Sequence, residues 1–404
     1  MFRRVFALLM LLVALVLVGQ PRASSVVDLE LTISGDDFQI DGVTKFLPIA
    51  SYFDAIHADL AKVDDDFGFL KADKFEGVRI LPNWYRIPGP PDSTDYYLAQ
   101  DTLFDKDGNL RTATLNKLLD ILDLAKDHGL VVDLSFTVET VVDCPADNCK
   151  AEDDYTSALT YAEYKNALED ITTVLESGGS AYKHVMFDLQ NEYDLNDPSD
   201  LSWDAGDMDD LAEAVHAIDS SRIVFASLGS SGWTATQAAN EADLAELDVA
   251  LMHEPRVEDW GNLSDLRASN MGAATDLPLY FQESPRYRTG EHSTSAWWSS
   301  AQAEKSLYEA RRMGAAAWNF HTRGGFSLND AHSGINDSIY DNLTLEDSTF
   351  MTARLKEILE CVQDNDCPVA DLAPVPAPSM LTLVRTLLRL GGKPVEFVRS
   401  AILQ

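Results

Sequence analysis

Short apolar runs recur along this chain and alternate with stretches of helical periodicity, which limits the folds open to it. Leucines and isoleucines at helical spacing over residues 115–124 end at His128 and Gly129, a typical helix stop. Strands that alternate with helices indicate βα units and a parallel sheet. Eight runs have the length and composition of buried strands: Phe46–Ser51, Val78–Leu81, Val131–Phe136, Val185–Leu189, Ile223–Ala226, Val249–Met252, Leu277–Phe281 and Ala315–Phe320.

Eight such units predict an α/β fold, the (β/α)8 TIM barrel. A doubly wound sheet is the alternative, but no GxGxxG turn occurs in the sequence. Residues 28–48 alternate apolar and polar side chains around two turn pairs, Gly35-Asp36 and Asp41-Gly42. We therefore expect a short N-terminal β-hairpin that closes the bottom of the barrel. Helical spacing that stops at Gly314, and again over residues 352–362, predicts the last two helices.

The two ends of the chain differ from its middle. Arg3 and Arg4 precede an apolar run over residues 5–18 and small residues near Ala23, the pattern of a secretory signal peptide over residues 1–23. That run is too short to span a membrane comfortably, so we expect a secreted or periplasmic protein without an integral membrane span. The barrel is expected over residues 24–367. Residues 368–404 form a Pro-rich linker and a basic amphipathic tail, which either packs on a membrane or on the barrel or has no function.

The net charge of −35 and the pI of about 4.3 limit the partners. Nucleic acids and anionic membranes are polyanions, so neither is expected to bind. The acidic surface fits a soluble exported protein or, alternatively, adaptation to high salt. In an exported chain the cysteines predict two local disulfides, Cys144 with Cys149 and Cys361 with Cys367. Neither spacing is the CxxC of a zinc site, and we expect no metal or other cofactor.

Two carboxylates follow predicted strands that face each other across the mouth of a barrel. The fourth strand ends in Asn191-Glu192 and the seventh ends in Glu283. Active sites of such barrels lie at the carboxyl ends of the strands. Glycoside hydrolysis requires a proton donor and a second carboxylate at the anomeric carbon, about 5 Å apart where configuration is retained. We therefore predict a retaining glycoside hydrolase in which Glu192 and Glu283 are catalytic.

These residues resemble the signature of the clan A glycoside hydrolases and are nearest to the cellulase-like family 5. Arg79 in the second strand, His253 at the end of the sixth and Trp318 in the eighth also match the pattern of that family. The resemblance covers residues 28–366. It implies that Glu192 is the acid/base and Glu283 the nucleophile.

The same resemblance implies further contacts at the site. Asn191 would bond the 2-hydroxyl of the sugar, Arg79 would hold the nucleophile ionised, and Trp318 would form the floor of the subsite for the reacting sugar. Aromatic rings bind the C–H faces of sugars, which suggests outer subsites. The candidates for substrate contacts near the predicted rim are Trp84, Tyr85, Trp297, Trp298, His321 and Arg323.

Two strand ends depart from the family pattern. The third strand, DLSFTVET, ends without the usual histidine, and Glu254-Pro255-Arg256 follows His253 where a tyrosine is usual. These departures indicate a divergent or separate family. Its polysaccharide or oligosaccharide substrate cannot be inferred from the substrates of cellulases. The departures leave open a non-catalytic glycan-binding barrel. A metal-dependent barrel hydrolase is a third possibility, but it needs an HxH pair where this chain has only His57.

Overall fold

The computed structural model describes only part of the chain. It covers residues 28–52, 55–56, 58–83, 86–87, 97–98, 102–105, 107–137, 159–193, 203–227, 246–253, 277–283, 307–308, 310–311, 314–320 and 357–361. The chain divides into units of residues 1–363 and 364–404, and the second unit lies outside these ranges. The signal peptide and the C-terminal tail therefore stay predictions. Among the described helices, none is both long enough and apolar enough to cross a membrane.

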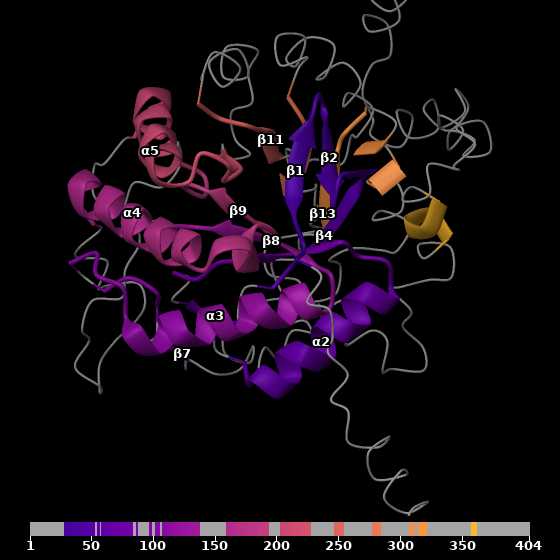
Figure 1. Ribbon diagram of the computed structural model, residues 1–404, viewed down its shortest axis with the longest axis horizontal. Coiled ribbons are helices and arrows are strands. Elements are labelled where there is room, and N and C mark those ends of the chain that lie inside the picture. Colours follow the sequence, from indigo (N-terminus) through magenta and orange to yellow (C-terminus); the bar gives the residue numbers. More distant parts are fainter. Residues whose placement is uncertain are drawn as a thin grey trace, which may run out of the picture. The chain divides into compact units, whose positions relative to one another are not determined.

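Parallel strands form the centre of the fold, and each coincides with one of the predicted apolar runs (Figure 1). Their order in the sheet is β10-β9-β8-β5-β4-β13-β12-β11. In chain order the strands are β4 (Leu47–Ser51), β5 (Gly77–Ile80), β8 (Val131–Ser135), β9 (Val185–Asp188), β10 (Val224–Phe225), β11 (Ala250–His253), β12 (Leu279–Glu283) and β13 (Ala317–Phe320).

The sheet curves round until its ends nearly meet. The first strand, β4, pairs in parallel with both β5 and the last strand, β13. Between β10 and β11, the amide of Asp248 donates a hydrogen bond of 2.9 Å to the carbonyl of Val224, and the Asp248 carboxylate accepts one of 2.9 Å from the Val224 amide. The eight strands therefore form a nearly closed barrel, which confirms the predicted (β/α)8 architecture.

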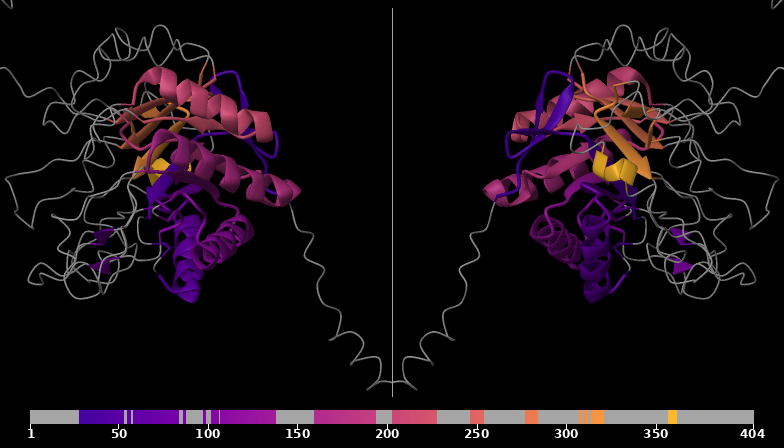
Figure 2. Two further views of the ribbon diagram at one scale, coloured as in Figure 1. Left: turned by 90° about the vertical axis from the view of Figure 1, so that its left-hand side faces the viewer. Right: turned by 90° about the vertical axis from the view of Figure 1, so that its right-hand side faces the viewer.

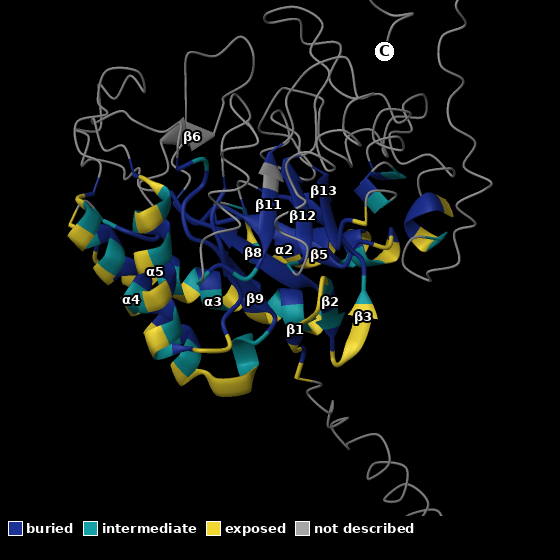
Figure 3. Cartoon of the chain, turned by 90° about the horizontal axis from the view of Figure 1, so that it is seen from above, coloured by how far each residue is buried: buried dark blue, intermediate teal, exposed yellow. Residues whose placement is uncertain are grey.

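Helices lie against the outside of part of this barrel (Figures 1 and 2). They are α2 (Leu60–Ala72), α3 (Thr112–Asp127), α4 (Tyr161–Ser177) and α5 (Ala205–Ile218), with a short 3-10 turn, η1 (Gly179–Tyr182), before β9. A two-stranded antiparallel pair, β6 (Arg86–Ile87) and β7 (Tyr97–Leu98), follows β5. Figure 3 shows exposed residues on the outer faces of the helices and buried residues along the strands, as amphipathic helices around a barrel require.

The end of one helix, predicted from the sequence, and the start of another have clear local causes. The α3 helix ends at Asp127, and Gly129 follows with φ 69°, a left-handed conformation that glycine adopts without steric cost. The α4 helix begins with a capping box in which Thr160 accepts from the amide of Glu163 and the Glu163 side chain accepts from the amide of Thr160. Both features fix where the chain enters and leaves the helical layer.

The last predicted helix is described over residues 357–361, which are helical. Cys361 in this segment is disulfide-bonded. Cys144, Cys149 and Cys367 lie outside the described residues, so the two pairings stay predictions.

The N-terminal hairpin is a three-stranded antiparallel sheet of β1 (Leu31–Ser34), β2 (Asp37–Ile40) and β3 (Val43–Lys45). Its tight turns place Gly35, Asp41 and Gly42 at positive φ angles of 65°, 53° and 74°. Leu31 and Phe38 pack in one buried cluster with apolar side chains of the barrel interior. The prediction of a hairpin that closes one end of the barrel is confirmed, with one strand more than expected.

The inside of the barrel changes from apolar to polar along the strands. The buried cluster that receives the hairpin contains Ile49, Val131, Met186, Phe225, Leu251, Tyr280 and Ala317. Towards the carboxyl ends of the strands a second set of side chains is equally buried but polar. This polar layer consists of Ser51, Arg79, Asp133, Ser135, Asp188, Ser227, His253, Gln282 and Asn319, each at most 3% exposed. The hairpin therefore closes the apolar end, and the polar end is left for chemistry.

Truncating the hairpin side chain at the barrel bottom should test this closure. Phe38 is fully buried, so Phe38→Ala is expected to lower the free energy of unfolding by about 3 kcal/mol through lost apolar burial and a residual cavity. Urea unfolding followed by circular dichroism measures the change. Val43 in the same sheet is 56% exposed, and Val43→Ala should cost less than about 0.5 kcal/mol. Equal losses in both variants would contradict the packing described here.

Candidate active site

The guanidinium of Arg79 lies at the centre of the polar layer. Its side chain is fully buried. Nε donates to Ser135 Oγ at 2.7 Å, Nη1 to Glu283 Oε1 at 3.1 Å and Nη2 to Asn191 Oδ1 at 2.5 Å. The planar fork of an arginine suits three such divergent acceptors, which a single ammonium group cannot match. Arg79 thus ties the ends of β8, β9 and β12 to β5.

Two buried aspartates share the charge of Arg79. The nearest carboxylate oxygen of Asp133 lies 3.8 Å from Nε and that of Asp188 lies 3.6 Å from Nη2. Gln282 Nε2 donates to one oxygen of each at 2.9 Å, and the Tyr280 hydroxyl donates to Asp133 at 2.9 Å. Burial raises the pKa of both carboxyl groups above their ordinary value, although Arg79 opposes the shift. This pair therefore holds protons more tightly than exposed aspartates do.

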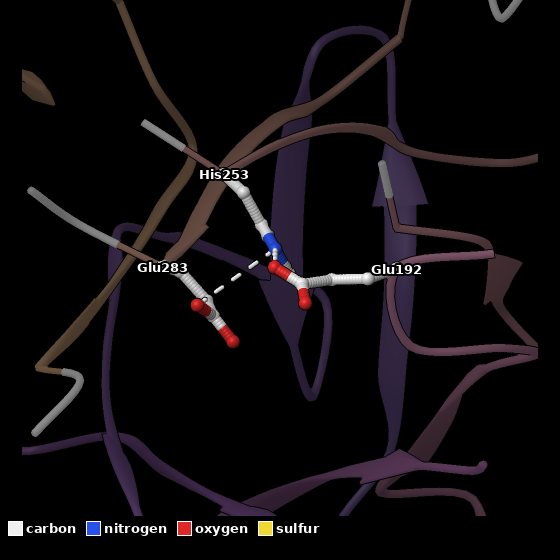
Figure 4. Close-up of side chains that lie close together, drawn as sticks. All are labelled: Glu192, His253 and Glu283. Carbon is white, nitrogen blue, oxygen red and sulfur yellow. Dashed lines mark hydrogen bonds and ion pairs between the residues drawn. The ribbon is translucent and has the colours of Figure 1, made fainter. Parts of the chain in front are cut away.

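Glu192, His253 and Glu283 converge at the mouth of the barrel (Figure 4). His253 Nδ1 lies 3.1 Å from Glu192 Oε1 and 3.8 Å from Glu283 Oε2. One carboxylate oxygen from each glutamate and the imidazole nitrogen all lie within 4.8 Å of one another. The side chains of Glu192 and Glu283 are 18% and 9% exposed, whereas His253 is fully buried. Both carboxylates therefore remain open to a ligand at the rim.

The charges around His253 set its protonation. Burial lowers the pKa of the imidazole, but the negative charge of Glu283 and the hydrogen bond and charge of Glu192 outweigh burial and the opposing charge of Arg79. The pKa of His253 therefore lies above its ordinary value.

The backbone turns sharply at Glu192. Its φ of 51° is in the left-handed region, which residues other than glycine occupy only rarely. The amide of Glu192 donates to Ser227 Oγ at 2.8 Å, and this hydroxyl donates in turn to Asp188 Oδ2 at 3.1 Å. The chain is held in this turn by the end of β10, and the turn aims the Glu192 carboxylate at His253.

The structure brings together five of the residues singled out in the sequence: Arg79, Asn191, Glu192, His253 and Glu283. Trp318 is also described, whereas the others are not. Trp84, Tyr85, Glu254, Trp297, Trp298, His321 and Arg323 lie outside the described residues, as does His57.

Trp318 is described, but as a packed side chain. It is 1% exposed and lies edge-on to Phe320 at a ring-centroid distance of 6.2 Å. The next residue, Asn319, donates to Ser51 and to the carbonyl of Gln282 inside the barrel. Because successive residues of a strand point to opposite faces, Trp318 lies on the face of β13 away from these groups. Its contact with a sugar stays a prediction.

Several residues of the site were not singled out in the sequence: Asp133, Ser135, Asp188, Ser227, Tyr280, Gln282 and Asn319. A signal for most of them is present. Polar residues interrupt apolar runs at the spacing of two residues that faces one side of a strand, as Asp133 and Ser135 do in VVDLS. Polar residues repeated near the end of almost every run predict a polar layer inside the barrel.

The three residues at the mouth also form a possible metal site. Two carboxylates and an imidazole are a donor set that zinc accepts, and their atoms are close enough to share an ion. Glycoside hydrolysis would use the same three side chains. They cannot bind a metal ion and act on a glycosidic bond at the same time.

Comparisons with known proteins identify the fold. No protein-family model and no curated protein matches the chain. The endo-1,4-β-mannanase from Rhizomucor miehei matches with a TM-score of 0.52 at 14% identity, over 82% of this chain and 99% of that one. A glycoside hydrolase family 5 mannosidase from the same organism matches with a TM-score of 0.54 at 13% identity, over 83% and 99%. The β-mannanase from Thermomonospora fusca matches with a TM-score of 0.52 at 13% identity, over 82% and 99%.

This chain has the fold of those enzymes. At such low identity the likeness concerns the fold, and it agrees with the family resemblance noted in the sequence. The β-mannanases and mannosidases are what the chain is similar to, and its own activity has to be argued from the site.

Removing the buried cation should destabilise the polar layer. Arg79→Met leaves Asp133, Asp188 and Glu283 without their shared partner, and we expect a loss of about 3 kcal/mol or more in the free energy of unfolding. Urea unfolding at neutral pH measures it. Lys165→Met, which removes the surface pair with Asp210, should cost less than about 1 kcal/mol. A loss in Arg79→Met no larger than in this control would show that the layer does not depend on Arg79.

Proposed function

We propose that this protein is a retaining glycoside hydrolase that cleaves β-glycosidic bonds in a polysaccharide or oligosaccharide. The observation that supports the proposal most directly is the approach of the Glu192 and Glu283 carboxylates, whose nearer oxygens lie within 4.8 Å of each other. Retaining enzymes hold their two carboxyl groups about 5 Å apart, whereas inverting enzymes need about 6.5–9.5 Å for an intervening water. The short distance favours double displacement.

Glu283 has the surroundings of a nucleophile. It accepts a hydrogen bond from Arg79 and lies 3.8 Å from His253, so positive charge stabilises its carboxylate form. In the proposed reaction its oxygen forms a bond to the anomeric carbon while the bond from that carbon to the leaving oxygen breaks. The product of this step is a glycosyl ester on Glu283.

Glu192 is the proposed acid/base. It is the more exposed of the two carboxyl groups and pairs with an imidazole instead of an arginine. In the first step it gives a proton to the leaving oxygen. In the second step its carboxylate takes a proton from water, whose oxygen attacks the anomeric carbon and releases Glu283 as a carboxylate.

Asn191 is the proposed contact for a sugar hydroxyl. Its Oδ1 accepts from Arg79, which turns the amide nitrogen towards the opposite side as the donor. The nature of the sugar is a further proposal. Because the solved structures named above are β-mannanases and a mannosidase, β-1,4-mannan and its oligosaccharides are the first substrates to test. The pattern at residues 1–23 supports action outside the cytoplasm.

Two conservative substitutions test the assignment. Glu192→Gln and Glu283→Gln each remove a proton-transfer or nucleophilic group without changing the side-chain volume, so kcat is expected to fall about 10³-fold or more while the fold persists. Reducing-end release from a panel of polysaccharides, with products identified by mass, is the measurement. Glu30→Gln, at an exposed position, is the matched control and should leave kcat unchanged. Azide should restore turnover of an activated glycoside in Glu283→Ala but form no adduct on an inverting enzyme.

The same panel separates the alternatives. Affinity for a polysaccharide without any product, in the unsubstituted protein, would indicate the glycan-binding barrel that the two departures from the family pattern leave open. Stoichiometric zinc or another transition metal in elemental analysis, with activity lost on chelation, would indicate the metal-dependent hydrolase. Full activity in either Gln variant would overturn the assignment of the two glutamates.

A further inference from the structure

We propose that Gln282 is a positioning residue that fixes neutral His253 as the tautomer with its proton on Nε2, so that Nδ1 accepts a hydrogen bond from protonated Glu192. The inference rests on the proposed role of Glu192 as acid/base and extends it. Gln282 precedes the proposed nucleophile in β12, and it is fully buried.

The orientation of the Gln282 amide follows from its neighbours. Its nitrogen donates to Asp133 Oδ2 at 2.9 Å, to Asp188 Oδ2 at 2.9 Å and to Ser135 Oγ at 3.1 Å. The same two oxygens also accept from the hydroxyls of Tyr280 and Ser227, so both act as acceptors and the amide nitrogen faces the two aspartates. The amide oxygen then faces the opposite way, 2.8 Å from His253 Nε2.

This orientation determines where His253 carries its proton. An amide oxygen only accepts, so the nitrogen that contacts it, Nε2, has to be the donor. A neutral imidazole has one donor nitrogen and one acceptor nitrogen, which makes Nδ1 the acceptor. Nδ1 lies 3.1 Å from Glu192 Oε1. A hydrogen bond forms between these two atoms when they share one proton. The proton is either on Glu192, with neutral His253 as acceptor, or on Nδ1 of an imidazolium, with the Glu192 carboxylate as acceptor.

The tautomer matters for the first step of the proposed reaction. With Nδ1 as acceptor, neutral His253 stabilises the protonated form of Glu192, which is the form that donates to the leaving oxygen. The opposite tautomer would donate from Nδ1 to the carboxylate and stabilise the ionised form, which has no proton to give. Gln282 thus acts on the acid through the imidazole without touching substrate.

The charges around His253 act on its proton in opposite directions. Glu192 and Glu283 favour a proton on the imidazole, Arg79 disfavours it, and the coulombic interaction of Asp188 with His253 is also favourable. Asp133 is joined to the imidazole through Gln282. These carboxylates keep a proton in the pair formed by Glu192 and His253, and Gln282 determines which imidazole nitrogen exchanges it.

The tautomer can be observed directly by NMR of protein labelled with 15N in its eight histidines. The His253 signals are assigned by their absence from His253→Gln. We expect the Nε2–H form for neutral His253 in the unsubstituted protein. Gln282→Met keeps the side-chain length but removes the amide, and should shift His253 towards the Nδ1–H form. Tyr280→Phe, which removes another hydrogen bond to Asp133 but leaves Gln282 in place, is the matched control and should keep the Nε2–H form.

The pH profile of kcat/KM gives a second readout. In Gln282→Met the alkaline limb should move to lower pH, because an Nδ1–H tautomer donates to the group that has to give the proton, and Tyr280→Phe should not move it. An Nδ1–H tautomer in the unsubstituted protein would overturn the proposal even if no variant folds. An Nε2–H tautomer that persists in Gln282→Met would also overturn the proposal. The spectrum needs no substrate, so absence of hydrolysis would count against the proposed function and not against the tautomer.

Discussion

A guanidinium removed from water is the constraint on which the rest of the site depends. Moving an ion into the protein interior costs several kcal/mol, and only well-placed acceptors offset that cost. For Arg79 the acceptors are Ser135, Asn191 and Glu283. The compensating negative charges come from three other strands, in the form of Asp133, Asp188 and Glu283. A shift of one residue in the register of any of these strands would leave a charge unpaired. The strand register that closes the barrel is therefore also the register that pairs Arg79 with its carboxylates and builds the site.

The division of the barrel interior follows from this requirement. A polar layer around a buried charge needs a dry, rigid surrounding to keep its hydrogen bonds in place. The apolar half of the barrel, closed by Phe38 and its neighbours from the N-terminal sheet, provides that surrounding from below. Helices protect part of the outside. Glu192 and Glu283 retain some exposure, so water and ligand can approach them.

Much of this arrangement could be predicted from the sequence. Continuous apolar runs identify buried parallel strands, and all eight lie where they were expected. The carboxyl ends of parallel strands share one edge of the sheet. The sequence therefore predicts that Asn191-Glu192 and Glu283, which follow two such strands, lie close together. The network below them could not be predicted, since register between strands fixes which polar groups touch. Gln282 contacts Asp133, 149 residues away, only because β8, β9 and β12 reach the same height in the barrel. The orientation of Trp318 could not be predicted either, because the run of residues 315–318 does not show which face of the strand points inward.

The left-handed backbone conformation at Glu192 lowers the stability of the fold, while the carboxyl group at the same position is needed for the proposed activity. A glycine or an asparagine would adopt φ 51° more readily, and either would be favoured there if only the folded state mattered. Neither supplies a carboxyl group. Substitutions that raise thermal stability are therefore expected to accumulate at this residue in any selection for heat resistance that is blind to turnover. A thermostable variant of this protein should be engineered with position 192 held fixed.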